Sequence, residues 1–122
     1  MEQIIWLAIC LYHEARGESV DGQIAVAHVI MNRVEKDGKS VKDIVLKPWQ
    51  FSWANNGARP PIADYKAFAE CWSSAVECLK QRLEGETFQH ADHYFADYIK
   101  VPSWAKKMKH IATVGKHLFY KA

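Results

Sequence analysis

Residues 3–18, QIIWLAICLYHEARGE, determine how the rest of this chain folds. Positions 3–15 are apolar on nearly every side of a helix, which predicts a helix at the centre of the domain. Gly17 is a plausible left-handed stop for that helix. Ser19 can cap a second helix over about residues 20–35, which is also apolar on most faces. The two helices predict a tight corner around which a small core forms.

The remaining chain indicates further helices and a minor β element. Residues 41–46 suit a short capped helix, and residues 64–83 show apolar positions at the three- and four-residue spacing of an amphipathic helix. Residues 47–63, with three prolines, read as a long loop, and such loops in compact domains tend to be functional. A short turn or helix begins at residue 102, and residues 110–121 suggest a hairpin.

Composition limits the class of protein. The 122 residues, of which 49% are hydrophobic, predict a single mainly α (α+β) domain over residues 1–122. The formal net charge is +2, so the dense basic face of a nucleic-acid binder is not expected. Lysines between residues 100 and 116 suit either an anionic polymer or an ordinary solvated surface. We expect a monomer with no nucleic-acid partner.

Cysteines and the N-terminus indicate where the chain is made. Cys10, Cys71 and Cys78 are an odd number, and the last two would lie roughly 10 Å apart on a helix, too far for a disulfide. We expect three reduced thiols, as in a reducing compartment. Glu2 and the absence of a basic start argue against a signal peptide, and the apolar run ends at Tyr12, too early to span a bilayer. We therefore expect synthesis in the cytoplasm, without membrane insertion.

Glu14 is the first candidate for chemistry. It falls in the last turn of an otherwise apolar helix, where a carboxylate is costly unless it is paired or protonated. Burial raises the pKa of a carboxyl, and a protonated carboxyl against apolar walls is what a glycosidase needs as its general acid. The structural alternative is an interfacial glutamate paired with Arg16 or Arg33.

Glu18 could serve as a second catalytic carboxyl only if the helix continued unbroken, because it would then be the i, i+4 neighbour of Glu14. Because Gly17 is expected to break the helix, we assign Glu18 to favouring the N-terminus of the second helix.

A zinc site is the main chemical alternative. His13 and Glu14 begin like a zinc-protease motif, but the second histidine would fall at position 17, which is glycine. His90 and His93 have a possible ligand spacing but no nearby cysteine, and a histidine pair alone is a weak signal. We expect neither a metal nor a cofactor.

Two aromatic segments could bind a sugar, because they combine flat apolar rings with hydrogen-bonding groups. One is the loop segment 49–53, and the other is 93–95. The alternative is that Trp49 and Trp53 fold back into the core. The residues that could make such contacts are Trp49, Gln50, Phe51, Ser52 and Trp53 in the first segment and His93, Tyr94 and Phe95 in the second.

These residues belong to a set of motifs that resembles the spore-cortex-lytic type of cell-wall hydrolase, found in bacteria and phages. The resemblance covers about residues 4–121. The motifs are Leu7-Ala8, Tyr12 to Glu18, Gly22 to Ala27, Asn32-Arg33, Gln50 to Trp53, His93 to Phe95, Pro102 to Ala105 and Val114 to Tyr120. Their number and order make the resemblance specific.

The resemblance implies a lysozyme-like fold and cleavage of the β-1,4 bond between N-acetylmuramic acid and N-acetylglucosamine in peptidoglycan. It implies a lytic transglycosylase in which Glu14 acts first as acid and then as base, leaving 1,6-anhydro ends. It also implies that residues 50–53 and 94–95 line the glycan cleft. A hydrolytic N-acetylmuramidase and a non-catalytic glycan-binding or phage structural module stay open as alternatives. The absence of a visible leader or wall-binding domain suits a compact phage lysin acting on the wall.

Overall fold

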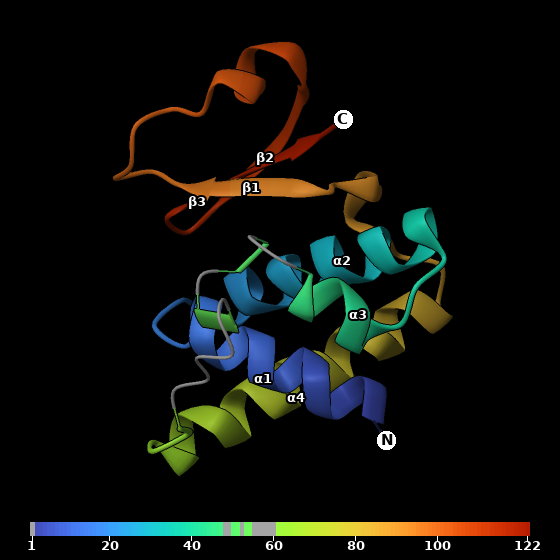
Figure 1. Ribbon diagram of the computed structural model, residues 1–122, viewed down its shortest axis with the longest axis vertical. Coiled ribbons are helices and arrows are strands. Elements are labelled where there is room, and N and C mark those ends of the chain that lie inside the picture. Colours follow the sequence, from blue (N-terminus) through green and yellow to red (C-terminus); the bar gives the residue numbers. More distant parts are fainter. Residues whose placement is uncertain (1, 48–49, 52, 55–60) are drawn as a thin grey trace.

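The computed structural model describes residues 2–47, 50–51, 53–54 and 61–122 (Figure 1). Its helices are α1 (Glu2–Ala15), α2 (Val20–Asp37), α3 (Val41–Leu46) and α4 (Tyr65–Leu83), with short 3-10 helices η2 (Phe88–His90) and η3 (Ser103–Lys107). Its strands are β1 (His93–Ala96), β2 (Lys109–Val114) and β3 (His117–Lys121). The mainly helical prediction, with a small β element near the C-terminus, is confirmed.

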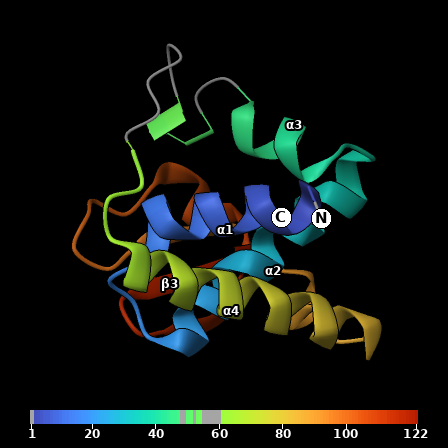
Figure 2. The ribbon, with the colours of Figure 1, turned by 90° about the horizontal axis from the view of Figure 1, so that it is seen from below.

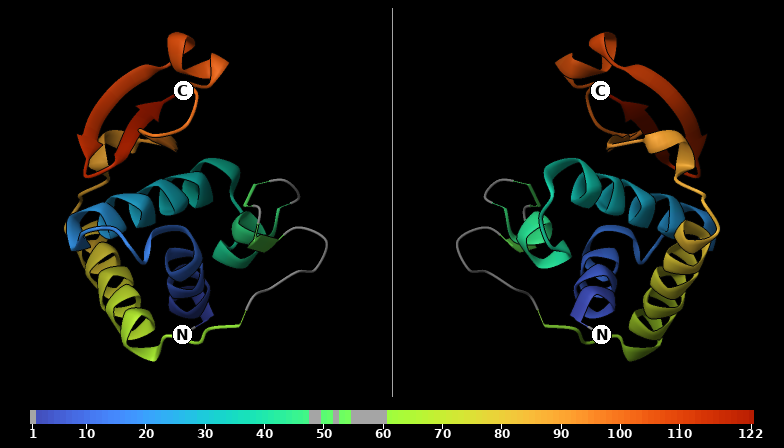
Figure 3. Two further views of the ribbon diagram at one scale, coloured as in Figure 1. Left: turned by 90° about the vertical axis from the view of Figure 1, so that its left-hand side faces the viewer. Right: turned by 90° about the vertical axis from the view of Figure 1, so that its right-hand side faces the viewer.

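Helix α1 is central, as its all-round apolar sequence predicts. It contacts α2, α3 and α4, and Figure 2 shows it running alongside α4. Figure 3 shows α1 enclosed by the other helices. Its buried side chains lie on several faces of the helix: Leu7, Ala8, Cys10, Leu11, Tyr12 and Ala15.

The helix boundaries follow from local capping chemistry. Ser19 and Ser40 accept hydrogen bonds from the backbone N–H groups of Gly22 and Asp43, each at 3.1 Å, so both predicted N-caps form. Helix α1 ends at Ala15, where the Glu18 N–H donates to the Ala15 carbonyl. Gly17 is not among the positive-φ glycines, so the prediction that it is a left-handed stop is wrong.

A buried glutamine ties three helices together at the corner after α1. The Nε2 group of Gln23, on α2, donates to the Ala15 carbonyl at 3.3 Å and to Oε1 of Glu70 at 3.1 Å. Ser74 Oγ donates to the side-chain Oε1 of Gln23 at 2.7 Å. This polar hub satisfies a carbonyl at the end of α1 and fixes α4 against the corner.

The three strands form an antiparallel sheet in the order β1-β3-β2, which lies over α2 in Figure 1. The predicted hairpin is β2 and β3, whereas β1 joins the sheet from a segment not predicted as a strand. Tyr94 pairs with Phe119 across β1 and β3. Asn32 on α2 donates through Nδ2 to the carbonyls of Thr87 and Ala91, which holds the chain entering β1 against the helices.

The three cysteines are free and buried, as predicted. Burial raises the pKa of Cys71 to about 11 and that of Cys78 to about 12, so both thiols are inert near neutral pH. Among the described residues, no helix is both long and apolar enough to cross a membrane.

Candidate active site

Glu14 lies at the junction between the helices and the sheet. It is in the last turn of α1, and its side chain is half-buried. The Tyr94 hydroxyl, on β1, donates to Oε1 of Glu14 at 2.6 Å. The fold therefore brings a carboxyl from the first helix into contact with a phenol from the first strand.

The surroundings of Glu14 favour retention of its proton. Burial raises its pKa, and this effect outweighs the hydrogen bond from Tyr94 and the charge of Arg33, which both lower it. Burial and the adjacent Glu14 charge also hold the pKa of Tyr94 well above its usual value, so the phenol keeps its proton and remains a donor. The site thus pairs a poised acid with a fixed neutral donor.

Arg33 supplies the positive charge of the site. Its Nε donates to the Asp92 carbonyl at 2.8 Å, and its guanidinium lies 5.9 Å from the centre of the Phe51 ring. The Nη1 atom is buried and has no hydrogen-bond partner among the described residues. Arg33 therefore has donor capacity left inside the site.

The alternative prediction for Glu14 is an ion pair with Arg16 or Arg33. Within the described part of the chain, Glu14 forms no ion pair with Arg16 or Arg33. Arg16 instead donates to the Tyr12 carbonyl at 3.2 Å and lies over the Tyr12 ring. Among the described residues, Glu14 is therefore held by a hydrogen bond from the neutral phenol of Tyr94 rather than by a direct ion pair.

The aromatic loop reaches the end of α1. The Trp53 ring stacks on the ring of His13, the residue before Glu14, at a centroid distance of 4.5 Å. It also lies 6.4 Å from the Phe51 ring. Phe51 is only 4% exposed and belongs to the core, whereas Trp53 and Gln50 are half-buried. Of the other loop candidates, Ser52 and Trp49 lie outside the described residues.

Tyr94 and Phe95 point to opposite faces of the sheet, because successive residues of a strand alternate. Tyr94 faces the helices with Phe119 and Glu14. Phe95 is buried on the other face, between Trp104 and Tyr120, with ring centroids 5.7 and 5.6 Å away. The structure therefore brings Tyr94, but not Phe95, to Glu14.

Glu18 has a partner that the sequence did not suggest. Its Oε1 lies 3.3 Å from His117 Nδ1, close enough for an ion pair though without hydrogen-bond geometry, and accepts from the Lys116 backbone N–H at 3.4 Å. The carboxylate thus joins the corner between α1 and α2 to the β2–β3 turn. His117 also packs edge-on against Tyr94, at 5.2 Å. Its presence in one of the sequence motifs was the only signal of this role.

In the part of the chain that the structure describes, histidine and carboxylate groups do not gather into a metal site. Among the described residues, no three His, Cys, Asp or Glu side chains are placed to hold a metal ion. His93 Nδ1 lies 3.0 Å from Asp92 Oδ1, and His90 is exposed. His93 is therefore paired with its neighbour in sequence, and Asp92 in turn accepts from the Ala122 N–H at 2.9 Å.

Comparisons with known proteins agree with the motif pattern. A family model described as cell wall hydrolase matches residues 17–120, and Glu14 lies just before the matched residues. The spore cortex-lytic enzyme of Bacillus subtilis is 29% identical over 93% of the chain, and that of Oceanobacillus iheyensis is 30% identical over 94%. The chain spans only 35% and 40% of these two relatives.

Two solved structures have the same fold. The catalytic domain of the germination-specific lytic transglycosylase SleB from Bacillus anthracis matches with a TM-score of 0.76 and 26% identity, over 99% of this chain and 95% of that one. The catalytic domain of SleB from Bacillus cereus matches with a TM-score of 0.74 and 26% identity, over 99% of this chain and 91% of that one. Because the family model covers most of the sequence and these folds agree throughout, the chain belongs to the cell wall hydrolase family.

Proposed function

We propose that this chain is a peptidoglycan lytic transglycosylase in which Glu14 is the single catalytic carboxyl. The observation that carries the proposal is the state of Glu14: a half-buried carboxyl with a raised pKa and one oxygen held by Tyr94. Family membership and the likeness to a lytic transglycosylase domain support the same reaction class. The two assignments have independent origins, one chemical and one comparative.

The reaction requires Glu14 to give and then take one proton. Protonated Glu14 donates its proton to the glycosidic oxygen as the C1–O4 bond breaks, and N-acetylglucosamine leaves with a free 4-hydroxyl. The electron-deficient C1 of N-acetylmuramic acid is then attacked by that sugar's own 6-hydroxyl. Glu14, now a carboxylate, removes the 6-hydroxyl proton, and a 1,6-anhydro ring closes without consumption of water. A raised pKa suits both steps, because it favours the protonated acid in the first step and makes the carboxylate a stronger base in the second.

Tyr94 and Arg33 fit supporting roles in this cycle. Because Tyr94 donates to Oε1, the transferable proton belongs on Oε2, which has no hydrogen-bond partner among the described residues. The charge of Arg33 lowers the pKa of Glu14, so it stabilises the carboxylate that forms after the first proton transfer. We assign Tyr94 to positioning the carboxyl and Arg33 to balancing its charge.

The position of Glu18 favours transglycosylation over hydrolysis by two carboxylates. Glu18 Oε1 is committed to His117 and to the β2–β3 turn, whereas Asp21 is exposed and lines a hollow with His28. In the described structure, neither Glu18 nor Asp21 forms a hydrogen bond with Glu14 or shares a hydrogen-bond partner with it. A hydrolytic muramidase would need one of them, or a positioned water, beside the scissile bond.

The cleft assignments remain part of the proposal. Trp53 is well placed to offer an aromatic face beside Glu14, because it stacks on the neighbouring His13. Gln50 and Ser52 would supply polar contacts, and Phe51 would support the loop from the core. Phe95 would act only indirectly, through the packing of β1.

We also propose that the chain acts as one catalytic domain and as a monomer on glycan strands of the wall, without a cofactor. The end-to-end match with a separately solved catalytic domain supports the single unit. Gel filtration with light scattering tests the monomer.

Product analysis tests the reaction. Purified peptidoglycan is digested, and the fragments are weighed by mass spectrometry. Fragments ending in 1,6-anhydro-N-acetylmuramic acid, lighter by one water than reducing ends, are expected, and Glu14→Gln should abolish them. Glu2→Gln, an exposed change on the same helix, is the matched control and should release fragments at the normal rate.

Two other results would replace the proposal. Reducing ends alone would indicate a hydrolytic muramidase. Unchanged wall clearing by Glu14→Gln would remove the catalytic assignment and leave a glycan-binding module.

A further inference from the structure

Three large apolar side chains lie exposed within four consecutive residues of the loop between β1 and η3. Tyr98 is 79% exposed, Ile99 48% and Val101 58%. Single exposed apolar residues are normal on a protein surface, whereas contiguous apolar patches are typical of interaction sites. The other large exposed hydrophobic residues of the described chain are spread over three helices: Ile5, Val20, Tyr65, Val76 and Leu83.

Positive charge surrounds this loop. Residues 93–122 contain six lysines and a single acidic residue, Asp97, whereas residues 1–92 contain ten basic and thirteen acidic residues. None of the six lysines forms an ion pair with another described residue. Lys100 and Lys106 line a hollow of about 590 Å³ together with Val101. Unpaired cations thus flank the exposed apolar side chains.

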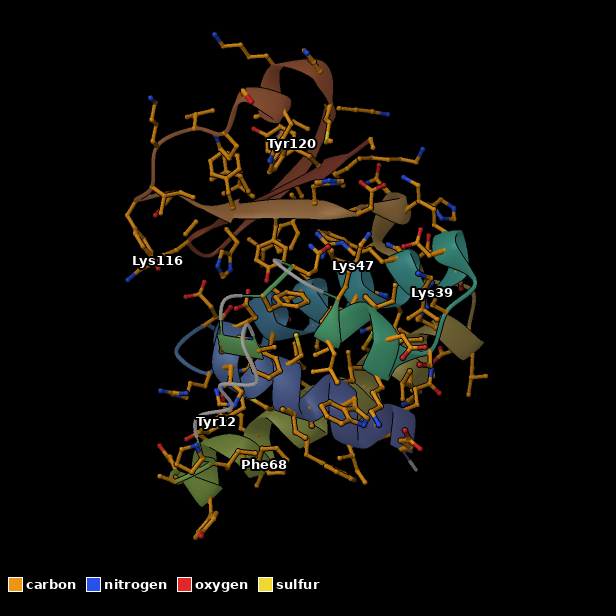
Figure 4. The ribbon with its side chains drawn as sticks, viewed as in Figure 1. Tyr12, Lys39, Lys47, Phe68, Lys116 and Tyr120 are labelled. Atoms are coloured by element: carbon orange, nitrogen blue, oxygen red, sulfur yellow. The ribbon has the colours of Figure 1, made fainter. Side chains whose placement is uncertain are left out.

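A third lysine lies at the same edge of the sheet. The Asp97 N–H donates to the Lys116 carbonyl at 2.7 Å, which fixes the start of the loop beside the β2–β3 turn. Figure 4 shows the Lys116 side chain projecting outward at this edge. The apolar loop therefore begins beside a third lysine.

We propose that the 98–106 face, defined as Tyr98, Ile99, Lys100, Val101 and Lys106, docks on a lipid bilayer that carries anionic headgroups. Apolar side chains rest at the boundary between headgroups and acyl chains, while lysines meet the anionic phosphates. The contact is made by loop side chains at the surface. It does not require a spanning helix.

A soluble polyanion is the competing partner, and the apolar side chains decide against it. A polymer of phosphodiesters would neutralise the lysines but would leave Ile99 and Val101 in water. A bilayer surface satisfies both groups at once. The inference is independent of the proposed reaction, because the loop carries none of the groups assigned to it.

Vesicle cosedimentation of the full chain tests the docking. The protein should sediment with vesicles of equal parts phosphatidylcholine and phosphatidylglycerol, but not with phosphatidylcholine alone. Ile99→Ser with Val101→Ser should weaken the binding about tenfold or more through lost apolar contact. Lys100→Gln with Lys106→Gln should weaken it by a similar factor, since each lysine near an anionic surface contributes about fivefold.

Matched changes on α4 control for exposure and charge. Val76→Ser with Leu83→Ser, and Lys66→Gln with Lys80→Gln, should leave vesicle binding unchanged. Circular dichroism of every variant confirms the fold, and cleavage of soluble glycan fragments should be unaffected by the loop changes.

Two results would overturn the docking. One is the absence of binding to the anionic vesicles. The other is binding that survives Ile99→Ser with Val101→Ser and is competed fully by purified teichoic acid, which would assign the face to a polyanion.

Discussion

The Tyr94 hydroxyl donates to Oε1 of Glu14 at 2.6 Å, across a sequence separation of 80 residues. This bond joins the sheet to the end of the central helix, and it also determines which oxygen of the carboxyl is free to transfer a proton. The same contact therefore contributes to the stability of the fold and to the proposed proton transfer. A change at Tyr94 or Glu14 should affect both stability and activity.

Tyr94→Phe should lower kcat while leaving the protein folded. Loss of a hydrogen bond to a charged carboxylate corresponds to about tenfold to hundredfold in rate. Because that bond lowers the pKa of Glu14, its removal should move the pH–rate profile to higher pH. The profile is measured on purified peptidoglycan, with Tyr98→Phe as the control for an exposed tyrosine. An unchanged profile would show that Tyr94 does not position the acid.

Glu14→Gln should make the protein more stable even as it becomes inactive. Burial raises the pKa of Glu14 in the folded state, so its ionisation costs stability above the folded pKa, and that cost disappears below the unfolded pKa of about 4.3. Glutamine can still accept the Tyr94 hydrogen bond. We expect a gain of about 1 kcal/mol in the free energy of unfolding at pH 8, which is typical of single stabilising substitutions. Near pH 4 the gain should be small.

Urea unfolding at both pH values measures this difference. Glu2→Gln should show no comparable pH-dependent gain, because Glu2 is exposed. A loss of stability at pH 8 on Glu14→Gln would contradict the raised pKa.

His28 should make the fold sensitive to mild acid. Arg82 Nη1 lies 3.1 Å from His28 Nδ1 and can only donate, so Nε2 carries the proton and donates to Gln81 Oε1 at 2.8 Å. Burial lowers the pKa of His28, with a smaller contribution from the charge of Arg82, whereas the Gln81 bond and Glu86 oppose the shift. The neutral form is therefore favoured by folding.

A lowered histidine pKa gives stability that is complete above the unfolded pKa of about 6.5 and declines as the pH falls toward the folded value. His13 and His117 are shifted in the same direction by burial and add to the effect. The three histidines should thus lower the free energy of unfolding between about pH 7.5 and about pH 5.5, a contribution opposite in sign to that of Glu14. His28→Gln should flatten part of this slope, and an identical slope in that variant would exclude His28 as a contributor.

Gln23→Leu should cost about 2 to 4 kcal/mol of stability, the range for buried polar groups left without partners. The change removes the donor to Ala15 and Glu70 and the acceptor of Ser74. Gln3→Leu, on exposed α1 surface, is the control and should change stability by less than about 0.5 kcal/mol. Equal effects of the two changes in urea unfolding would show that the hub is not important.

Local sequence rules predicted the helices because their determinants are local. Ser19 and Ser40 cap their helices through hydrogen bonds to residues only three positions later. The apolar period of residues 64–83 matches α4 closely. Burial in an apolar helix made Glu14 a candidate acid but left a paired interfacial glutamate equally open, and it was the resemblance of the ordered motifs that favoured a catalytic role.

The sheet and its contacts with the helices could not be predicted in this way. Strand β1 pairs with β3 more than twenty residues later, and no local pattern encodes that pairing. Phe88, Gln89 and His90 all have positive φ, a conformation that side chains other than glycine rarely adopt, so tertiary contacts must enforce it. The contacts of Tyr94 with Glu14 and of His117 with Glu18 depend on this placement.

Gly115 and Gly17 give the last test, because the two glycines sit at either end of the contact between Glu18 and the hairpin but have different backbones. Gly115 has φ +57°, and a Cβ there would lie 3.4 Å from Glu18 Oε1. Gly17 lacks a positive φ, and a Cβ there meets nothing within 4 Å. Gly115→Ala should therefore lose about 1 kcal/mol or more, because alanine disfavours the left-handed region. Gly17→Ala should be neutral or stabilise by up to about 1 kcal/mol through reduced freedom of the unfolded chain. Thermal unfolding of both variants measures the contrast, and a larger loss at Gly17 would show that the α1–α2 corner needs glycine for its backbone after all.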